Sequence, residues 1–169
     1  MAQPRLIACI LLKEGLIVRS QLFSIHQVIG TPISTVQRLS TWNIDELVLL
    51  DISEDDYHDM RRDDLYMRYS GTSTLEILGQ ISEVCFMPLA FGGRIRSIGD
   101  ISDRLAAGAD KCIINTAAFS DPQILTKGAK NFGSQCIVVS VDAKKTGEEE
   151  WRVFTHGGRT PTGIDAVKW

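Results

Sequence analysis

Carboxylate side chains stand at the ends of two apolar segments in this 169-residue sequence, where buried strands would finish. Asp142 closes the segment 136–142, and Asp51 comes near the end of the segment 46–52. A carboxylate at the end of a strand can serve as a general acid or base toward a bound substrate. Capping the following loop is an equally ordinary role, so the residue types leave both readings open for Asp142.

Two further loops carry groups that suit an anion. Gly92 and Gly93 follow one apolar segment and allow the backbone to approach a ligand closely. Asn115 and Thr116 follow the next segment and add an amide and a hydroxyl, while a helix start at Ser97 would add backbone N–H donors. These groups predict a phosphate bound between the two loops. The alternative is that the glycines only turn a loop and that Asn115 only satisfies backbone groups.

A second polar set stands at the opposite ends of the apolar segments. Arg5, Glu46 and Lys111 each precede or open such a segment. Charges of both signs at equivalent places can form a ring beneath a barrel of strands. The alternative is a set of solvated strand ends without a common role.

Five short apolar segments would have to position these residues. They are continuous, not alternating, which indicates strands buried on both faces, and they cover residues 6–12, 46–52, 85–91, 111–115 and 136–142. Helix-start signals lie between them, at Thr31-Pro32, at Ser97 with Asp100, and at Asp121-Pro122. Strands that alternate with four crossover helices predict a parallel α/β architecture.

Two parallel architectures are compatible with this order, a doubly wound sheet and a (β/α)8 barrel. The sequence has no GxGxxG after its first strand, which disfavours the dinucleotide-binding doubly wound fold. Residues 9–13 are echoed at 141–144, and each copy is followed by a short β-like run, at 16–18 and 151–154. A repeat of four βα units would explain the echo and favours the barrel.

Composition excludes several classes of protein. Lys and Arg number 18 against 21 Asp and Glu, a formal charge of −3, which disfavours nucleic acid as a partner. No apolar run reaches the roughly 18 residues of a membrane span, and no secretory signal opens the chain, so the expected location is the cytoplasm. The four cysteines and three histidines form no ligand pattern, so we expect neither a metal nor a cofactor. The charged stretch 54–64 predicts an exposed loop, with His58 at the surface.

Several motifs together resemble the cyclase subunit of imidazole glycerol phosphate synthase. They include RLIACILLKEG at 5–15, IDELVLLDI at 44–52, FGGRI at 91–95, GADKCIINTAAF at 108–119, FGSQCIVVSVDAKK at 132–145 and FTHGGRTPTGIDAVKW at 154–169. The resemblance implies a (β/α)8 TIM barrel built as a four-plus-four repeat. It also implies a glutaminase partner docked beneath the barrel, whose ammonia enters a lyase and cyclase reaction on a phosphorylated substrate in histidine biosynthesis.

The resemblance also implies roles for individual residues. Asp142 matches one of two catalytic acid/base carboxylates, and Gly93, Asn115 and Thr116 match part of a substrate-phosphate site. Asp51 matches a strand-end carboxylate that faces the active site, and Lys13 is shared with the family. Arg5, Glu46 and Lys111 match three members of the charged gate for ammonia.

Two residues depart from the family pattern. Leu11 stands where the family has its first-strand catalytic aspartate, and leucine can neither donate nor accept a proton. Arg94 stands where the family commonly has a third glycine. The change at Leu11 resembles paralogues that act with a glutaminase in surface-polysaccharide sugar modification, on a phosphorylated or nucleotide-sugar substrate. A non-catalytic phosphate-binding module is the other alternative.

The length of the chain is also a departure. A (β/α)8 barrel requires roughly 200 to 250 residues, and the chain reaches Trp169 soon after its fifth strand. We therefore expect residues 1–169 to be the N-terminal part of a single barrel domain, with about five of its βα units.

Overall fold

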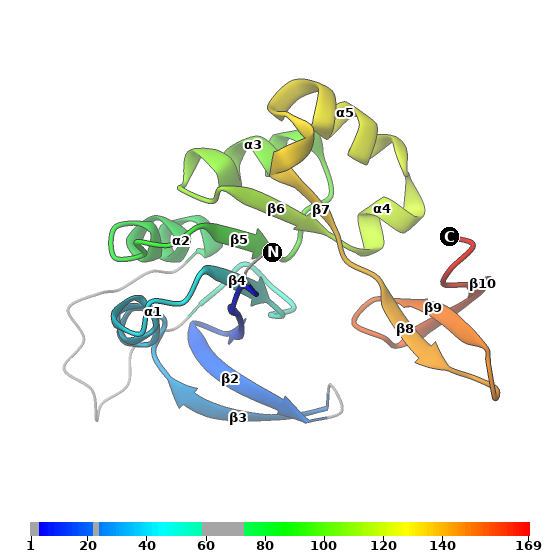
Figure 1. Ribbon diagram of the computed structural model, residues 1–169, viewed down its shortest axis with the longest axis horizontal. Helices are drawn as coiled ribbons and strands as arrows, with labels where there is room; N and C mark the ends of the chain where they lie inside the picture. The colour runs from blue at the N-terminus through cyan, green and yellow to red at the C-terminus, as the bar shows by residue number, and fades with distance from the viewer. Residues whose placement is uncertain (1–3, 22–23, 59–72) are drawn as a thin grey trace.

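The computed structural model describes residues 4–21, 24–58 and 73–169 (Figure 1). Its larger sheet has seven strands in the order β3-β2-β1-β4-β5-β6-β7. Five of them run parallel and coincide with the five apolar segments, namely β1 (Ile7–Lys13), β4 (Glu46–Asp51), β5 (Leu89–Gly92), β6 (Lys111–Ile114) and β7 (Ile137–Val139). The prediction of a parallel α/β sheet is therefore confirmed.

Two of the predicted strands are shorter than their apolar segments. β5 begins only at Leu89, because Pro88 has no N–H to give to a ladder, although its carbonyl accepts from Leu47 at 2.9 Å. β7 ends at Val139, and the chain then leaves the parallel sheet. Asp142 consequently opens the next strand, so the expectation that it closes the fifth parallel strand is wrong.

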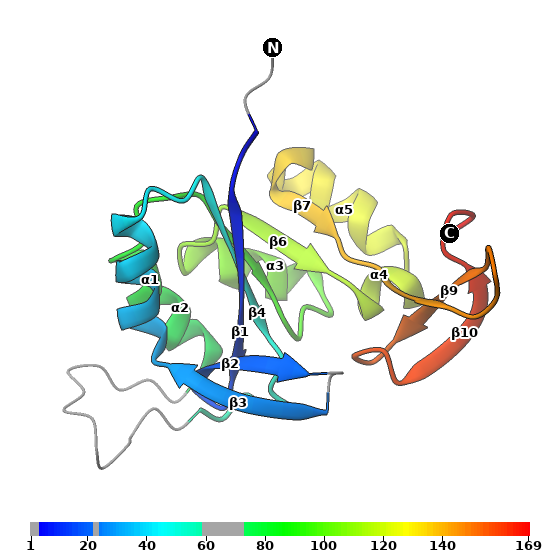
Figure 2. The same ribbon diagram turned by 60° about the horizontal axis from the view of Figure 1, so that its bottom comes forward.

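Antiparallel strands follow the first and the last of the parallel strands, β1 and β7. After β1 the chain turns back as β2 (Leu16–Gln21) and β3 (Ile25–Gly30). After β7 it forms a separate three-stranded sheet of β8 (Asp142–Lys145), β9 (Trp151–Thr155) and β10 (Thr160–Asp165). The β-like runs predicted after the two echoed segments are thus strands β2 and β9. Figure 2 shows the hairpin and the small sheet at the same end of the parallel strands.

Helices connect the parallel strands, as the start signals predict. They are α1 (Pro32–Thr41), α2 (Thr74–Ser82), α3 (Ile98–Ala106), α4 (Thr116–Ser120) and α5 (Gln123–Phe132), and a 3-10 turn η1 (Ser134–Cys136) precedes β7. Ser97 and Asp100 form the predicted capping box of α3. Thr31 is the N-cap of α1, but its hydroxyl contacts the Ser34 hydroxyl at 2.7 Å and no backbone N–H.

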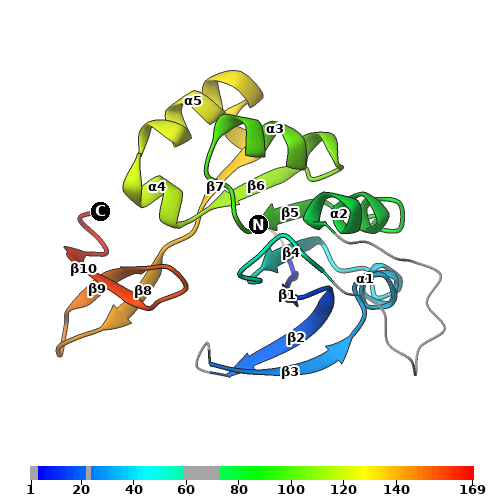
Figure 3. The same ribbon diagram turned by 180° about the vertical axis from the view of Figure 1, so that it is seen from behind.

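The helices cover one face of the parallel sheet. Figures 1 and 3 show the five strands as a curved wall with α1, α2, α3 and α5 outside it. Leu12, Leu47 and Leu49 pack against the α1 and α2 side chains in the larger core cluster. Because strand side chains alternate, Leu11 and Glu46 lie on the opposite face, which we call the inner face.

The sheet is open over the residues that the structure describes. β7 forms one edge, and on the other side β1 pairs with the hairpin only through its last residues, Leu11 to Lys13. Ile7 and Val139 are accordingly exposed large hydrophobic residues. The described strands therefore form part of a barrel-like wall and do not close it.

Candidate active site

A densely hydrogen-bonded polar cluster surrounds Asp51 at the end of β4. Its Oδ2 accepts from the Thr74 hydroxyl at 2.9 Å and from Arg94 Nη2 at 2.7 Å, and it lies 3.3 Å from His58 Nε2. Its Oδ1 accepts from the Ser53 N–H at 3.0 Å. The side chain is fully buried on the helix-covered face, because it continues the alternation of Leu47 and Leu49. Asp51 therefore belongs to a buried polar network at the strand end, and its predicted place beside a substrate stays a prediction.

Arg94 ties this cluster to the loop that follows β4. Besides Asp51, its guanidinium donates to Asp56 Oδ1 at 2.9 Å and to the carbonyls of Ser53 and Asp55 at 3.1 and 2.6 Å. It also contacts the Thr74 hydroxyl. The φ of Arg94 is 49°, a left-handed conformation that favours glycine. The backbone conformation at this position thus suits the third glycine that the family commonly has. In this chain the Arg94 guanidinium is held there by the five partners named above.

The charges of this cluster are mutually compensated. Burial by itself would raise the pKa of Asp51, but hydrogen bonds from His58 and Ser53 and the Arg94 charge outweigh it and lower that pKa below its ordinary value. Burial would likewise raise the pKa of Asp56, but hydrogen bonds from Thr74 and the Arg94 charge outweigh it and lower that pKa. Both carboxylates are therefore ionised at neutral pH and hold the loop against the sheet.

Gly92 and Gly93 are required by close packing at the end of β5. A Cβ on Gly92 would lie 2.7 Å from Leu50 Cδ2, and one on Gly93 would lie 2.5 Å from the Asp51 carbonyl oxygen. Gly93 also has a φ of +133°, which side chains rarely adopt. These contacts account for both glycines through packing, while their predicted contact with a phosphate stays a prediction.

Substituting Gly93 by alanine is expected to lower the free energy of unfolding by at least about 2 kcal/mol, since it combines a strained φ with a backbone clash. The matched control is Gly99→Ala within α3, where the nearest atom to the new Cβ is 3.5 Å away. That variant should be neutral or up to about 1 kcal/mol more stable. Urea denaturation compares the two, and equal stabilities would contradict the packing argument.

The capping box occupies part of the donors at the α3 start. The Ser97 hydroxyl accepts from the Asp100 N–H at 3.1 Å, and Asp100 Oδ2 accepts from the N–H groups of Ser97 and Arg96 at 2.8 and 2.9 Å. These three N–H groups are therefore satisfied within the protein. The contribution of the α3 start to a phosphate site stays a prediction.

Asn115 and Thr116 stand at the end of β6, beneath the small sheet. Thr116 Oγ1 accepts from the His156 N–H at 3.1 Å, and Arg159 lies 3.4 Å from Glu54 at the end of β4. The β9–β10 turn thus crosses the ends of the parallel strands. The Asn115 side chain makes no hydrogen bond with the described residues, which leaves its amide able to meet a ligand.

The remaining predicted residues come from the end of β1 and from the start of β8. Leu11 and Lys13 share the inner face of β1, and Lys13 Nζ is 3.9 Å from Glu14 Oε1. Asp142 is half-buried at the start of β8, opposite Phe154 in the ladder. Its carboxylate makes no hydrogen bond or ion pair within the described part of the chain. The structure therefore leaves Asp142 available for the proton-transfer role, which stays a prediction.

The three predicted charges at the opposite sheet end are linked in the structure. Glu46 accepts from Arg5 at 3.2 Å through Oε2 and from Lys111 at 2.5 Å through Oε1. The three residues come from the β1, β4 and β6 ends, and Glu46 is buried between the two cations. The charges are therefore in contact, while their role as a gate for ammonia stays a prediction.

Sequence reasoning missed the partners of Asp51. His58 was expected at the surface, but its side chain is buried with 1% of its area exposed, and Nε2 lies 3.0 Å from the Thr74 hydroxyl. The charged stretch 54–64 predicts one solvated loop, but His58 within it is buried, and residues 59–64 lie outside the described residues. A histidine and a threonine so far apart in sequence give no local signal of contact.

Two classes of site are not found in the described residues. No helix among them is long and apolar enough to cross a membrane. No group of three or more His, Cys, Asp or Glu side chains within the same ranges is arranged to hold a metal ion.

Comparison with known proteins places this architecture in a family. Residues 5–169 match the model of a family described as histidine biosynthesis protein. The imidazole glycerol phosphate synthase subunit HisF of Endomicrobium trichonymphae is 42% identical over 165 residues, which are 98% of this chain and 59% of that protein. The subunit of the same name from Myxococcus xanthus (strain DK1622) is 41% identical over 169 residues, or 100% of this chain and 62% of that protein.

The chain spans about three fifths of the length of the curated relatives that it matches. The family model, by contrast, covers almost the whole chain, and the parallel α/β sheet agrees with the (β/α)8 barrel of that family. The chain therefore belongs to the histidine biosynthesis protein family.

Proposed function

We propose that the chain forms part of an ammonia-accepting synthase subunit of a glutamine amidotransferase, of the imidazole glycerol phosphate synthase type. The observation that carries the proposal is the linked set Arg5, Glu46 and Lys111 at the start of the parallel strands. Both ion pairs lie where a barrel of this type would open toward a docked glutaminase. Breaking and remaking a Lys111–Glu46 contact could open a path for ammonia without unfolding the sheet.

Exposed aromatic residues at the same sheet end support a docked protein partner. Trp42 follows α1 just before β4 and is 63% exposed, and Phe86 lies between α2 and β5 and is 89% exposed. Aromatic side chains are enriched at the centres of protein interfaces. We therefore assign this end to the glutaminase, and the opposite end with Asn115, Thr116, Lys13 and Asp142 to a phosphorylated substrate.

Leu11 supports a second candidate. Its side chain lies on the inner face of β1, where Leu11 pairs with Leu50 of β4 and with Val18 of β2. No carboxylate is therefore present at that position. A subunit that still receives ammonia but lacks this acid/base suits a different acceptor, such as a sugar in surface-polysaccharide modification. A phosphate-binding module without turnover would explain the loss of chemistry equally well but would not need the linked charges.

Reversal of the charge at Lys111 tests the leading proposal. In the complete protein paired with its glutaminase, Lys111→Glu places a carboxylate against Glu46 and should disorder the linked set. Turnover supported by glutamine is expected to fall at least about tenfold, a cost of about 1.4 kcal/mol in the transfer step. Turnover of the cyclase substrate supported by free ammonium should change by less than about twofold.

Lys127→Glu is the matched control, because it makes the same charge change on the exposed face of α5. It should leave both activities unaltered. An equal loss of glutamine-supported and ammonium-supported turnover in Lys111→Glu would contradict the proposal and assign the ion pairs a folding role. Stimulated glutaminase with no turnover of the cyclase substrate from either nitrogen source would favour the second candidate.

A further inference from the structure

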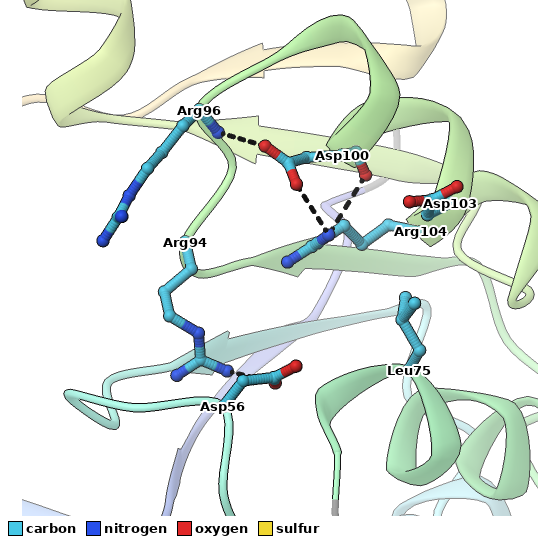
Figure 4. Close-up of a pocket in the computed structure, with 7 residues that line it drawn as sticks. All are labelled: Asp56, Leu75, Arg94, Arg96, Asp100, Asp103 and Arg104. Carbon is cyan, nitrogen blue, oxygen red and sulfur yellow. Dashed lines mark hydrogen bonds and ion pairs between the residues drawn. The ribbon is translucent and has the colours of Figure 1, made fainter.

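A polar cleft of about 360 Å³ lies between α2 and α3, away from the inner face (Figure 4). Its charged lining consists of three arginines and three aspartates, Arg94, Arg96, Arg104, Asp56, Asp100 and Asp103. None of these residues belongs to the linked charges at the strand starts or to the groups assigned to the substrate. The cleft therefore needs an explanation of its own.

Arg104 is the residue that the fold itself leaves unsatisfied. Its side chain is only 8% exposed, and its Nε is buried with no hydrogen-bond partner among the described residues. Its Nη1 reaches the Asp100 carbonyl oxygen and Oδ1, both at a long 3.4 Å. A buried guanidinium with an unpaired donor is costly unless an anion or acceptor meets it.

Asp100 cannot supply that acceptor. Its Oδ2 already accepts from the N–H groups of Arg96 and Ser97 and from the Ser97 hydroxyl, at 2.8 to 2.9 Å. Burial would raise the pKa of Asp100, but these hydrogen bonds and the Arg104 charge lower it, so the carboxylate stays ionised as the cap of α3. The Arg104 Nε is thus left buried without a protein partner in the described residues, and Nη2 of the same guanidinium, at the wall of the cleft, makes no hydrogen bond within them either.

The other two arginines differ in their hydrogen bonds within the described residues. Arg94 is held by Asp56, Asp51 and two carbonyls, so it forms a fixed wall of the cleft. The Arg96 guanidinium makes no hydrogen bond or ion pair within the described ranges. Figure 4 shows its exposed side chain extending away from Arg104 at the rim of the cleft, so it must turn inward to meet the same anion. Asp103 likewise has no ion pair in those ranges, so its carboxylate can accept from a ligand.

We propose that this cleft binds the phosphate group of a small hydroxylated molecule, with Arg104 and Arg96 as its cationic ligands. Arg104 would donate to a phosphate oxygen from Nη2, because its Nε is buried, and such a charge-assisted hydrogen bond is stronger than one between neutral groups. Asp103 then accepts from a hydroxyl of the same molecule. The site is separate from the strand-end substrate site and does not depend on the proposed function.

Arginine Nε–H resonances in a 15N-labelled sample of the protein test the site directly. Inorganic phosphate, β-glycerophosphate, acetate and glycerol are titrated to about 10 mM in separate experiments. We expect the Arg104 and Arg96 Nε–H signals to move with both phosphates, and β-glycerophosphate to bind at least about threefold more tightly because of its hydroxyl groups. Acetate and glycerol should move neither signal by a comparable amount.

Arg104→Met keeps an unbranched apolar stem in the same space and removes the guanidinium. It should weaken phosphate binding at least about tenfold, measured at Arg96. Arg38→Met, which removes an exposed arginine of α1, is the matched control and should bind like the unmodified protein. Stabilisation by phosphate in a thermal melt provides a second readout, and it should disappear only in Arg104→Met.

Unmoved Arg104 and Arg96 signals would overturn the proposal, as would phosphate binding of equal strength in Arg104→Met. Equal affinity for the two phosphates would refute the role of Asp103. The amide signals of Gly93 and Thr116 report the strand-end site in the same spectra. Shifts at those amides alone would leave the proposed function in place and remove only this inference.

Discussion

The complete gene that encodes this chain is expected not to restore growth to a histidine auxotroph that lacks the cyclase. Leu11 occupies the inner face of β1, where the family resemblance places one of two acid/base carboxylates. Loss of a general acid or base costs on the order of 10² to 10⁴ in rate. Lys13, on the same face two residues later, carries an ammonium group, which can donate protons but has no lone pair to accept one.

Leu11→Asp should restore growth, because it returns a carboxylate to the position opposite Asp142 in the proposed reaction. The matched control is Cys9→Asp, which introduces the same group two residues earlier on the same face and at an exposed position. Growth rates are measured with the abundance of all three proteins verified. Robust growth from the unmodified gene would sink the prediction, and so would failure of the soluble Leu11→Asp protein to improve on it.

Arg94→Ala is expected to lower the free energy of unfolding by about 3–5 kcal/mol. The substitution leaves the fully buried Asp51 carboxylate without its cation and releases two carbonyls of the β4–α2 loop. Arg159→Ala is the control, since it also removes an arginine paired with a carboxylate, here Glu54, but at a site where both side chains are exposed. An exposed pair of this kind contributes only about 0–1 kcal/mol.

Arg94→Gly should be about 1 kcal/mol less damaging than Arg94→Ala, because glycine adopts a φ of 49° without strain. Urea denaturation of the four proteins measures these differences. If Arg94→Ala lost no more stability than Arg159→Ala, the buried network would not hold the loop. If alanine and glycine were equivalent, the backbone at this position would not be strained.

The same network predicts how stability depends on pH. The pKa values of Asp51 and Asp56 lie below their ordinary values in the folded chain, so the stabilisation is complete above the ordinary aspartate range, near pH 4. This stabilisation is lost as the pH falls through the lowered pKa values of Asp51 and Asp56 in the folded chain. Arg94→Ala should show a shallower loss of stability below about pH 4 than the unmodified protein.

The parallel α/β architecture was predictable from the amino-acid sequence. Continuous apolar segments and helix-start residues are local signals, and each of the five segments overlaps a parallel strand. The capping box at Ser97 was predictable for the same reason, because its partners are three residues apart. The resemblance in turn located the linked charges Arg5, Glu46 and Lys111, which the strand register then brought together.

Contacts between polar residues follow from the tertiary fold. Asp51 is predictable as a strand-end carboxylate, but its burial beside Thr74, His58 and Arg94 follows from alternation along β4 and from the packing of α2. Asp142 was expected to end the fifth parallel strand, but the parallel ladder stops at Val139 and pairing with β9 begins a new sheet. Contacts between residues far apart in sequence depend on packing and register, and neither is encoded in a local pattern.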